Sequence, residues 1–138
     1  MRVIEGKSEI NVLLVEDDLD YRALVLALLP KPPVHVYPAE TPQVAYELFE
    51  RHRPDLVLMD IGLAYPGGIV ATDEIRKRAR ALKHEVVIIM STGSSRMEDV
   101  KRALHFGADD YMVKPISRGV LYEKIHAHFP AVPVPRRS

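Results

Sequence analysis

Residues 10–18 read Ile-Asn-Val-Leu-Leu-Val-Glu-Asp-Asp, a short aliphatic run that ends in three acidic side chains. A run of this length, rich in branched aliphatic residues, is typical of a buried strand in a parallel sheet. Similar short runs follow along the chain, and segments in which apolar residues have helical spacing separate them. The sequence therefore predicts repeated strand–helix units.

The predicted strands cover residues 10–15, 34–37, 55–59, 86–90 and 110–113. The predicted helices cover residues 19–29, 42–51, 71–82, 96–106 and 118–129. This alternation indicates an α/β fold: a flavodoxin-like, doubly wound (βα)5 domain with five parallel strands in the order 2-1-3-4-5. In that order the first and third strands lie side by side, where the strand order reverses.

The composition limits the class of protein. The chain has 138 residues, 19 basic and 19 acidic side chains, and no cysteine. The charge balance argues against direct nucleic-acid binding by this chain, and the lack of cysteine excludes disulfides and thiol chemistry. No apolar run approaches the roughly 20 residues of a membrane helix, so we expect a cytoplasmic protein with no membrane partner. We expect residues 1–9 to form an N-terminal leader and residues 130–138 a flexible proline-rich tail or linker stub.

Four of the five predicted strands end in polar residues that a strand interior does not explain. In chain order these are Glu16, Asp17 and Asp18, then Asp60, then Ser91 and Thr92, then Lys114 and Pro115. In open α/β sheets, ligands bind beyond the carboxyl ends of the strands, near the point where the strand order reverses. We therefore expect these side chains to form one site.

The residue types at this edge suit phosphoryl chemistry. The carboxylates of Glu16, Asp17 and Asp60 would repel one another, and Mg²⁺, which prefers oxygen ligands, would relieve that repulsion. Lys114 adds a fixed positive charge, and Ser91 adds a hydroxyl that rotates toward a new acceptor. Such a site neutralises a phosphoryl group in transfer, with a carboxylate as the nucleophile that becomes an acyl phosphate.

Four segments, taken together and in order, resemble the receiver domains of bacterial two-component response regulators. They are residues 13–18, 56–60, 88–91 and 107–115. The similarity covers about residues 9–129, and we assign residues 10–129 to the receiver domain. The resemblance implies that Asp60 accepts a phosphoryl group from a sensor histidine kinase or a phosphotransfer protein. It also implies that Glu16 and Asp17 hold Mg²⁺ and that the backbone carbonyl of Gly62 completes the metal site.

The resemblance also implies a switch. Ser91 and Lys114 are similar to the residues that bind the phosphoryl group, and Tyr111 is similar to an aromatic residue that rotates inward in response. The surface that changes would comprise the fourth helix, the fifth strand and the fifth helix. It would meet a downstream effector or a second copy of the chain. We therefore expect a signalling domain that catalyses only its own phosphotransfer and dephosphorylation, and not an enzyme.

Three positions depart from the receiver pattern. Ala64 stands where proline is common, Gly62 has no side chain, and Thr92 replaces the usual alanine or glycine. Gly62 and Thr92 fall beside the expected phosphoryl group. We therefore expect an altered lifetime of the phosphorylated state, and the sequence leaves the direction open.

Other features have simpler interpretations. We expect the basic run at residues 76–80 to form a solvated helix face. The six histidines (35, 52, 84, 105, 126 and 128) share no metal-ligand spacing near the carboxylates, and we expect them at the surface. Met97, Val100 and Leu104 form an apolar stripe on the fourth predicted helix, which favours a core position.

Other functions fit the sequence less well. A degenerate receiver that acts as a phosphate-independent interaction module stays open, because Ala64 weakens the receiver pattern. A flavodoxin-like cofactor binder is disfavoured, because the acidic residues 16–18 would repel a phosphate when no metal is present. A haloacid-dehalogenase-like phosphatase would need a second aspartate two residues after Asp60, where this chain has Gly62.

Overall fold

The fold is taken from a computed structural model, which describes residues 1–93 and 97–135. The strands are β1 (Ile10–Val15), β2 (Val34–Ala39), β3 (Leu56–Asp60), β4 (Val87–Thr92) and β5 (Asp110–Val113). The helices are α1 (Leu19–Leu28), α2 (Pro42–His52), α3 (Gly68–Leu82), α4 (Met97–His105) and α5 (Arg118–His128). Across the described ranges, no helix is both long enough and apolar enough to cross a membrane.

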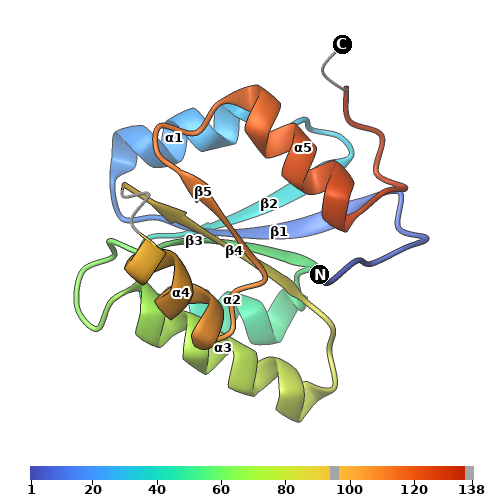
Figure 1. The fold of residues 1–138 in the computed structure, drawn as a ribbon. Coiled ribbons are helices and arrows are strands. Elements are labelled where there is room, and N and C mark those ends of the chain that lie inside the picture. The colour runs from blue at the N-terminus through green and yellow to red at the C-terminus, as the bar shows by residue number, and fades with distance from the viewer. Residues whose placement is uncertain (94–96, 136–138) are drawn as a thin grey trace.

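The strands form one parallel sheet in the order β2-β1-β3-β4-β5, which confirms the predicted flavodoxin-like (βα)5 fold. Helices α1 and α5 cover one face of the sheet, and α2, α3 and α4 cover the other (Figure 1). The strand order reverses between β1 and β3, so this point lies near the middle of the carboxyl edge. β2, which contains Pro38, and β5 are the two edge strands.

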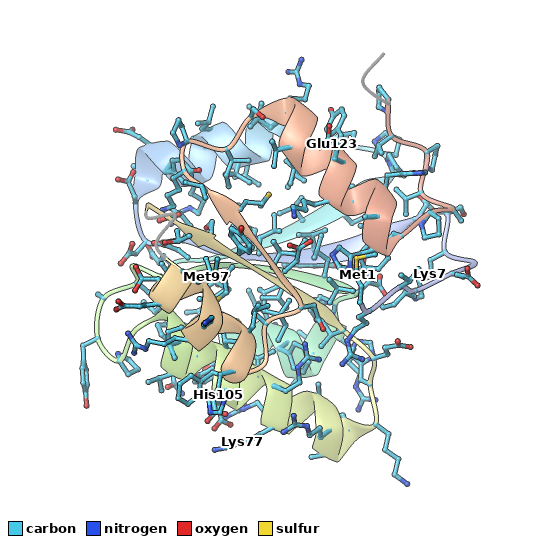
Figure 2. The ribbon with its side chains drawn as sticks, in the orientation of Figure 1. Met1, Lys7, Lys77, Met97, His105 and Glu123 are labelled. Atoms are coloured by element: carbon cyan, nitrogen blue, oxygen red, sulfur yellow. The ribbon has the colours of Figure 1, made fainter. Side chains whose placement is uncertain are left out.

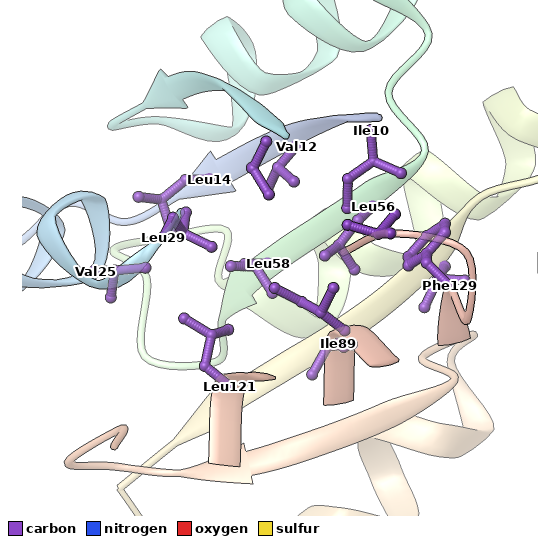
Figure 3. Close-up of a cluster of buried hydrophobic side chains, with 14 of the residues drawn as sticks. Ile10, Val12, Leu14, Val25, Leu29, Leu56, Leu58, Ile89, Leu121 and Phe129 are labelled. Atoms are coloured by element: carbon purple, nitrogen blue, oxygen red, sulfur yellow. The ribbon is translucent and has the colours of Figure 1, made fainter. Parts of the chain in front are cut away.

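Alternation along β1 explains how both faces of the sheet are covered. Ile10, Val12 and Leu14 point into the core under α1 and α5 (Figure 3). Leu13 and Val15 point into the core under α2 and α3. Full burial of each such side chain contributes about 1.5–3 kcal/mol, so a strand buried on both faces holds the two helical layers together.

Some element boundaries differ from the prediction. α3 begins at Gly68, three residues before the predicted start, and β3 and β4 continue through Asp60 and Thr92. Proline and glycine residues in the loop before α3 favour a late helix start in a sequence-based prediction, although Gly68 is helical here. The predicted start of the fourth helix, residue 96, lies outside the described residues.

The expectation of a solvated basic face on α3 is wrong for Arg76. Its side chain is only 7% exposed, and its guanidinium donates to the carbonyl oxygens of Val86 at 3.0 Å and Gly107 at 2.8 Å. It also pairs with Asp109 at 2.7 Å. Arg76 thus joins α3 to the residue before β4 and to the loop between α4 and β5. These partners lie too far along the chain for a helix pattern to indicate them.

His128 contradicts the expectation that the histidines lie at the surface, because it is fully buried. Its Nδ1 lies 2.6 Å from the carbonyl oxygen of Arg2, and its Nε2 lies 2.9 Å from a carboxylate oxygen of Asp110. Both partners accept hydrogen bonds, so the ring donates twice and carries a positive charge. Burial opposes ionisation of Asp110, but hydrogen bonds from His128 and Lys124 lower the pKa of Asp110 to about 2.

The segments on either side of residues 10–129 also contact the domain. Arg2 pairs with Asp109 at 3.0 Å, and the amide of Ile4 donates to the carbonyl oxygen of His128 at 2.8 Å. Figure 2 shows Met1 and Lys7 on the side of the molecule where α5 ends. After α5, Val132 is buried in the core under α1 and α5; of the predicted tail, residues 136–138 lie outside the described residues.

We predict that stability falls as the pH rises above neutral, and that His128 causes the fall. Its hydrogen bond to Asp110 raises the pKa of His128 against the effect of burial, and the charge of Asp109 adds to the rise. A raised pKa in the folded state gives stability that is present below the unfolded pKa, near 6.5, and lost as the pH passes the folded value. Urea unfolding between pH 6 and 9 should show a loss of roughly 1–2 kcal/mol.

The matched control for this prediction is the exposed His35, which lies 3.3 Å from Glu9. His128→Gln should flatten the pH dependence of the unfolding free energy, and His35→Gln should leave it unchanged. An equally steep dependence in His128→Gln would mean that another group titrates.

Candidate functional site

The strand register brings the polar strand ends together. Val15 of β1 lies opposite Met59 of β3, so Glu16 and Asp60, each one residue further on, are neighbours. On the other side of β3, Asp60 lies opposite Ser91 of β4. All three of these polar residues are buried. The predicted convergence at the reversal of strand order therefore arises from the backbone pairing itself.

Lys114 reaches this edge from the end of β5. Its ammonium lies 3.1 Å from Oε1 of Glu16 and 3.0 Å from Oδ1 of Asp60. Burial disfavours the charged ammonium, but the hydrogen bonds to Asp60 and Glu16 outweigh burial and raise the pKa of Lys114. The peptide bond between Lys114 and Pro115 is cis. The lysine is thus a fixed cation that bridges two buried carboxylates.

The acidic cluster has more negative charge than Lys114 neutralises. Glu16, Asp17 and Asp60 each offer a carboxylate oxygen, and these three atoms lie within 4.8 Å of one another. Burial raises the pKa of Glu16, and the charge of Asp60 adds to that rise. Mg²⁺–oxygen bonds of about 2.1 Å place ligand atoms no more than about 4.2 Å apart. The cluster therefore fits a small hard cation after only a slight contraction.

The loop after β3 is tied to the cluster by two backbone amides. The amide of Gly62 donates to Oδ1 of Asp60 at 2.9 Å, and that of Ala64 donates to Oδ2 of Asp17 at 3.0 Å. A proline at position 64 has no N–H and would lose the second bond. Ala64, a departure from the receiver pattern, therefore adds a contact that holds an acidic side chain of the cluster.

The residues predicted to respond to phosphorylation lie on β4 and β5, the strands that follow Asp60 in the sheet. Ser91 and Thr92 are buried at the end of β4. Tyr111 of β5 is half-buried and packs against the core under α2, α3 and α4. The ammonium of Lys124 on α5 lies 5.7 Å from the centre of the Tyr111 ring. Tyr111 therefore lies between the core and α5, within the surface predicted to change.

Two residues at the site were not anticipated from the sequence. The ring centre of Tyr21 lies 4.3 Å from the Lys114 ammonium, and Arg22 donates to the carbonyl oxygen of Glu16 at 3.0 Å. Asp18 caps α1 by accepting from the amide of Tyr21. Only the position of Tyr21 in the first turn after the acidic residues hinted at a role, and a single aromatic residue there is too common a feature to be singled out.

Comparison with known proteins agrees with this geometry. The family model described as the response regulator receiver domain matches residues 12–126. The cell cycle response regulator CtrA of Brucella ovis is 32% identical over 117 residues, which is 85% of this chain and 49% of that protein. The chain thus spans about half the length of the curated relatives it matches.

Solved structures give the same result. The receiver domain of Ssk1 from Saccharomyces cerevisiae, co-crystallised with the histidine phosphotransfer protein Ypd1, has a TM-score of 0.81 and 28% identity, with 89% of this chain and 90% of that chain covered. A two-component response regulator of the LuxR family from Aurantimonas sp. SI85-9A1 has a TM-score of 0.77 and 30% identity, with 87% of this chain and 84% of that chain covered. The chain belongs to the response regulator receiver domain family.

Proposed function

We propose that this receiver is a phosphorylation-driven switch in which Asp60 accepts the phosphoryl group. The observation that carries the proposal is the arrangement around Asp60: a buried carboxylate held by Lys114, with the oxygens of Glu16 and Asp17 within 4.8 Å. A structural ion pair would need one carboxylate for one lysine. Three carboxylates around one lysine leave an excess of negative charge that a divalent cation would offset.

The proposed reaction transfers a phosphoryl group to a carboxylate oxygen. An oxygen of Asp60 bonds to phosphorus as the bond from phosphorus to the donor breaks, and the donor nitrogen or oxygen leaves with that electron pair. The product is an acyl phosphate. Hydrolysis returns the carboxylate and releases inorganic phosphate, so the domain goes through a cycle.

The neighbouring groups supply charge and hydrogen bonds for that transfer. Glu16, Asp17, Asp60 and the carbonyl of Gly62 would hold Mg²⁺, which when bound neutralises charge on the phosphoryl oxygens. The carboxylate charge of Asp60 is lost once the group becomes an acyl phosphate, so Lys114 would become free to bind a phosphoryl oxygen. The hydroxyl of Ser91, on the strand next to Asp60, would donate to another.

The donor would be a sensor histidine kinase or a histidine phosphotransfer protein. The receiver of Ssk1 is seen bound to a phosphotransfer protein of this kind, and the present chain shares its fold along nearly the whole domain. Phosphohistidine is a suitable donor, because the Asp60 oxygen that would attack its phosphorus and break the P–N bond is already oriented by Lys114. Asp60 lies at the carboxyl edge of the sheet, where a partner can approach.

The output surface would be formed by α4, β5 and α5. The apolar stripe on α4 is only partly core, since Val100 is buried but Met97 is 63% exposed, and this corrects the expectation for Met97 and Leu104. Phe106 and Val113 also expose part of their side chains. Movement of Ser91 and rotation of Tyr111 would repack this surface for a second copy of the chain or a downstream effector.

Acetyl phosphate, with Mg²⁺ or with a chelator, gives the direct test. Intact-protein mass spectrometry should detect one phosphoryl adduct that requires Mg²⁺ and is released at alkaline pH. A folded protein that forms no adduct and binds no Mg²⁺ would instead favour the phosphate-independent interaction module.

We predict that Gly62→Asn slows loss of the phosphoryl group severalfold. A Cβ at position 62 would lie 3.5 Å from Oδ1 and 3.8 Å from Oδ2 of Asp60, which are ordinary contact distances. A side chain there fits and covers the carboxylate, so an attacking water would have less access. The measurement is adduct decay after removal of the donor. Unchanged decay would show that water approaches from elsewhere.

A further inference from the structure

Tyr21 contacts the catalytic lysine and the chain segment that follows it. The Lys114 ammonium lies over the Tyr21 ring, 4.3 Å from its centre. The Tyr21 hydroxyl oxygen accepts a hydrogen bond from the amide of Ile116, two residues beyond Lys114, at 3.0 Å. One aromatic side chain therefore holds both the charged end of Lys114 and the backbone next to it.

Contacts at the start of α1 hold Tyr21 in place. The carboxylate of Asp18 caps the helix by accepting from the amide of Tyr21 at 2.9 Å. The Tyr21 ring packs against the core under α1 and α5. Burial raises the pKa of Tyr21, so its hydroxyl stays neutral. A ring anchored by a helix cap and a packed core gives the lysine a rigid neighbour.

We infer that Tyr21 is a positioning residue that keeps Lys114 over the phosphoryl site, an inference that rests on the proposed function of Asp60. In the absence of a phosphoryl group, Glu16 and Asp60 hold the ammonium. Bound Mg²⁺ would offset the charge of Glu16, and phosphorylation of Asp60 would replace its carboxylate charge with that of the phosphoryl group. Both ion pairs would therefore weaken at the step where the lysine is needed. The attraction between a cation and the face of a ring does not depend on either carboxylate and persists through that step.

The first test compares two substitutions of Tyr21. Tyr21→Leu removes the ring and should lower the rate of labelling by acetyl phosphate roughly threefold to tenfold. Tyr21→Phe keeps the ring and should restore most of the rate, although it loses the bond to Ile116. If Tyr21→Phe restores the labelling rate, the ring is what Lys114 requires and the hydroxyl is not.

Tyr46 on α2 offers a matched control. Its ring lies under the guanidinium of Arg78, 4.6 Å from the centre, and it is half-buried like Tyr21. Tyr46→Leu therefore removes the same kind of residue and the same kind of cation–π contact, but at a site that does not include Lys114. Its labelling rate should equal that of the wild type. An equal loss of rate in Tyr46→Leu and Tyr21→Leu would overturn the inference.

A second measurement does not depend on phosphorylation. NMR of protein with labelled lysine should show the side-chain proton resonances of Lys114 shifted by the ring current of Tyr21. The shift should vanish in Tyr21→Leu and persist in Tyr21→Phe. Unchanged Lys114 signals in Tyr21→Leu would overturn the inference. If the signals change but wild-type protein forms no adduct, the contact is real and the proposed function of Asp60 is what fails.

Discussion

Asp60→Asn should abolish the phosphoryl adduct under conditions that label the wild-type protein. The amide of asparagine does not form an acyl phosphate, so the expected loss is complete. The substitution preserves the shape of the side chain and removes one of the three carboxylates in the acidic cluster. Mg²⁺ affinity should therefore fall as well, by roughly tenfold or more. Mass spectrometry and a Mg²⁺ titration measure the two effects.

Asp55 is the matched control for this substitution. It is a buried aspartate immediately before the same strand, where it accepts from the amide of Asn11 at 2.9 Å and pairs with Lys7. Asp55→Asn should lower stability slightly and leave both labelling and Mg²⁺ affinity unchanged. A persisting adduct in Asp60→Asn would mean that another residue accepts the phosphoryl group.

Gly68→Ala should be strongly destabilising, although it adds only one methyl group. A Cβ at Gly68 would lie 2.1 Å from the carbonyl oxygen of Asp60 and 2.7 Å from the Cα of Ile61. Both contacts are with backbone, so no side chain can rotate away to relieve them. Overpacking commonly costs about 1–3 kcal/mol and the cost is at the upper end or beyond when backbone must move. We expect that loss in urea unfolding, together with slower labelling of Asp60.

Gly93 provides the comparison for Gly68, because a Cβ there meets nothing within 4 Å. Gly93→Ala should change the unfolding free energy by less than about 0.5 kcal/mol. If Gly68→Ala were equally harmless, the first turn of α3 would have to pack against β3 more loosely than the structure indicates. The pair thus tests the close approach of α3 to the phosphoacceptor.

The fold and the centre of the site were predictable because their signals are local. Strands buried on both faces read as short aliphatic runs, and polar residues that end such runs must lie at one edge of a parallel sheet. Glu16, Asp60 and Lys114 were found in this way. Their roles in phosphoryl transfer came from the family resemblance and remain proposals, as does the role of Tyr111.

The features that escaped prediction depend on partners far along the chain. Arg76 and His128 are polar residues in helices. Nothing nearby in the sequence indicates that they bind carbonyl groups and carboxylates in the interior of the fold. Arg2, which contacts His128, is 126 residues away. Tyr21 looks like an ordinary aromatic residue of an amphipathic helix. Only the tertiary structure places it against Lys114.

The two edge strands of the sheet, β2 and β5, limit how copies of this chain can associate through strand pairing. β5 has only four residues, and β2 interrupts its row of backbone donors at Pro38. Neither strand therefore offers a long unbroken edge onto which another strand could add. Concentrated solutions should resist the sheet extension that leads to fibrils. Two copies that associated through the side chains of their helical faces would depend on charge and shape instead.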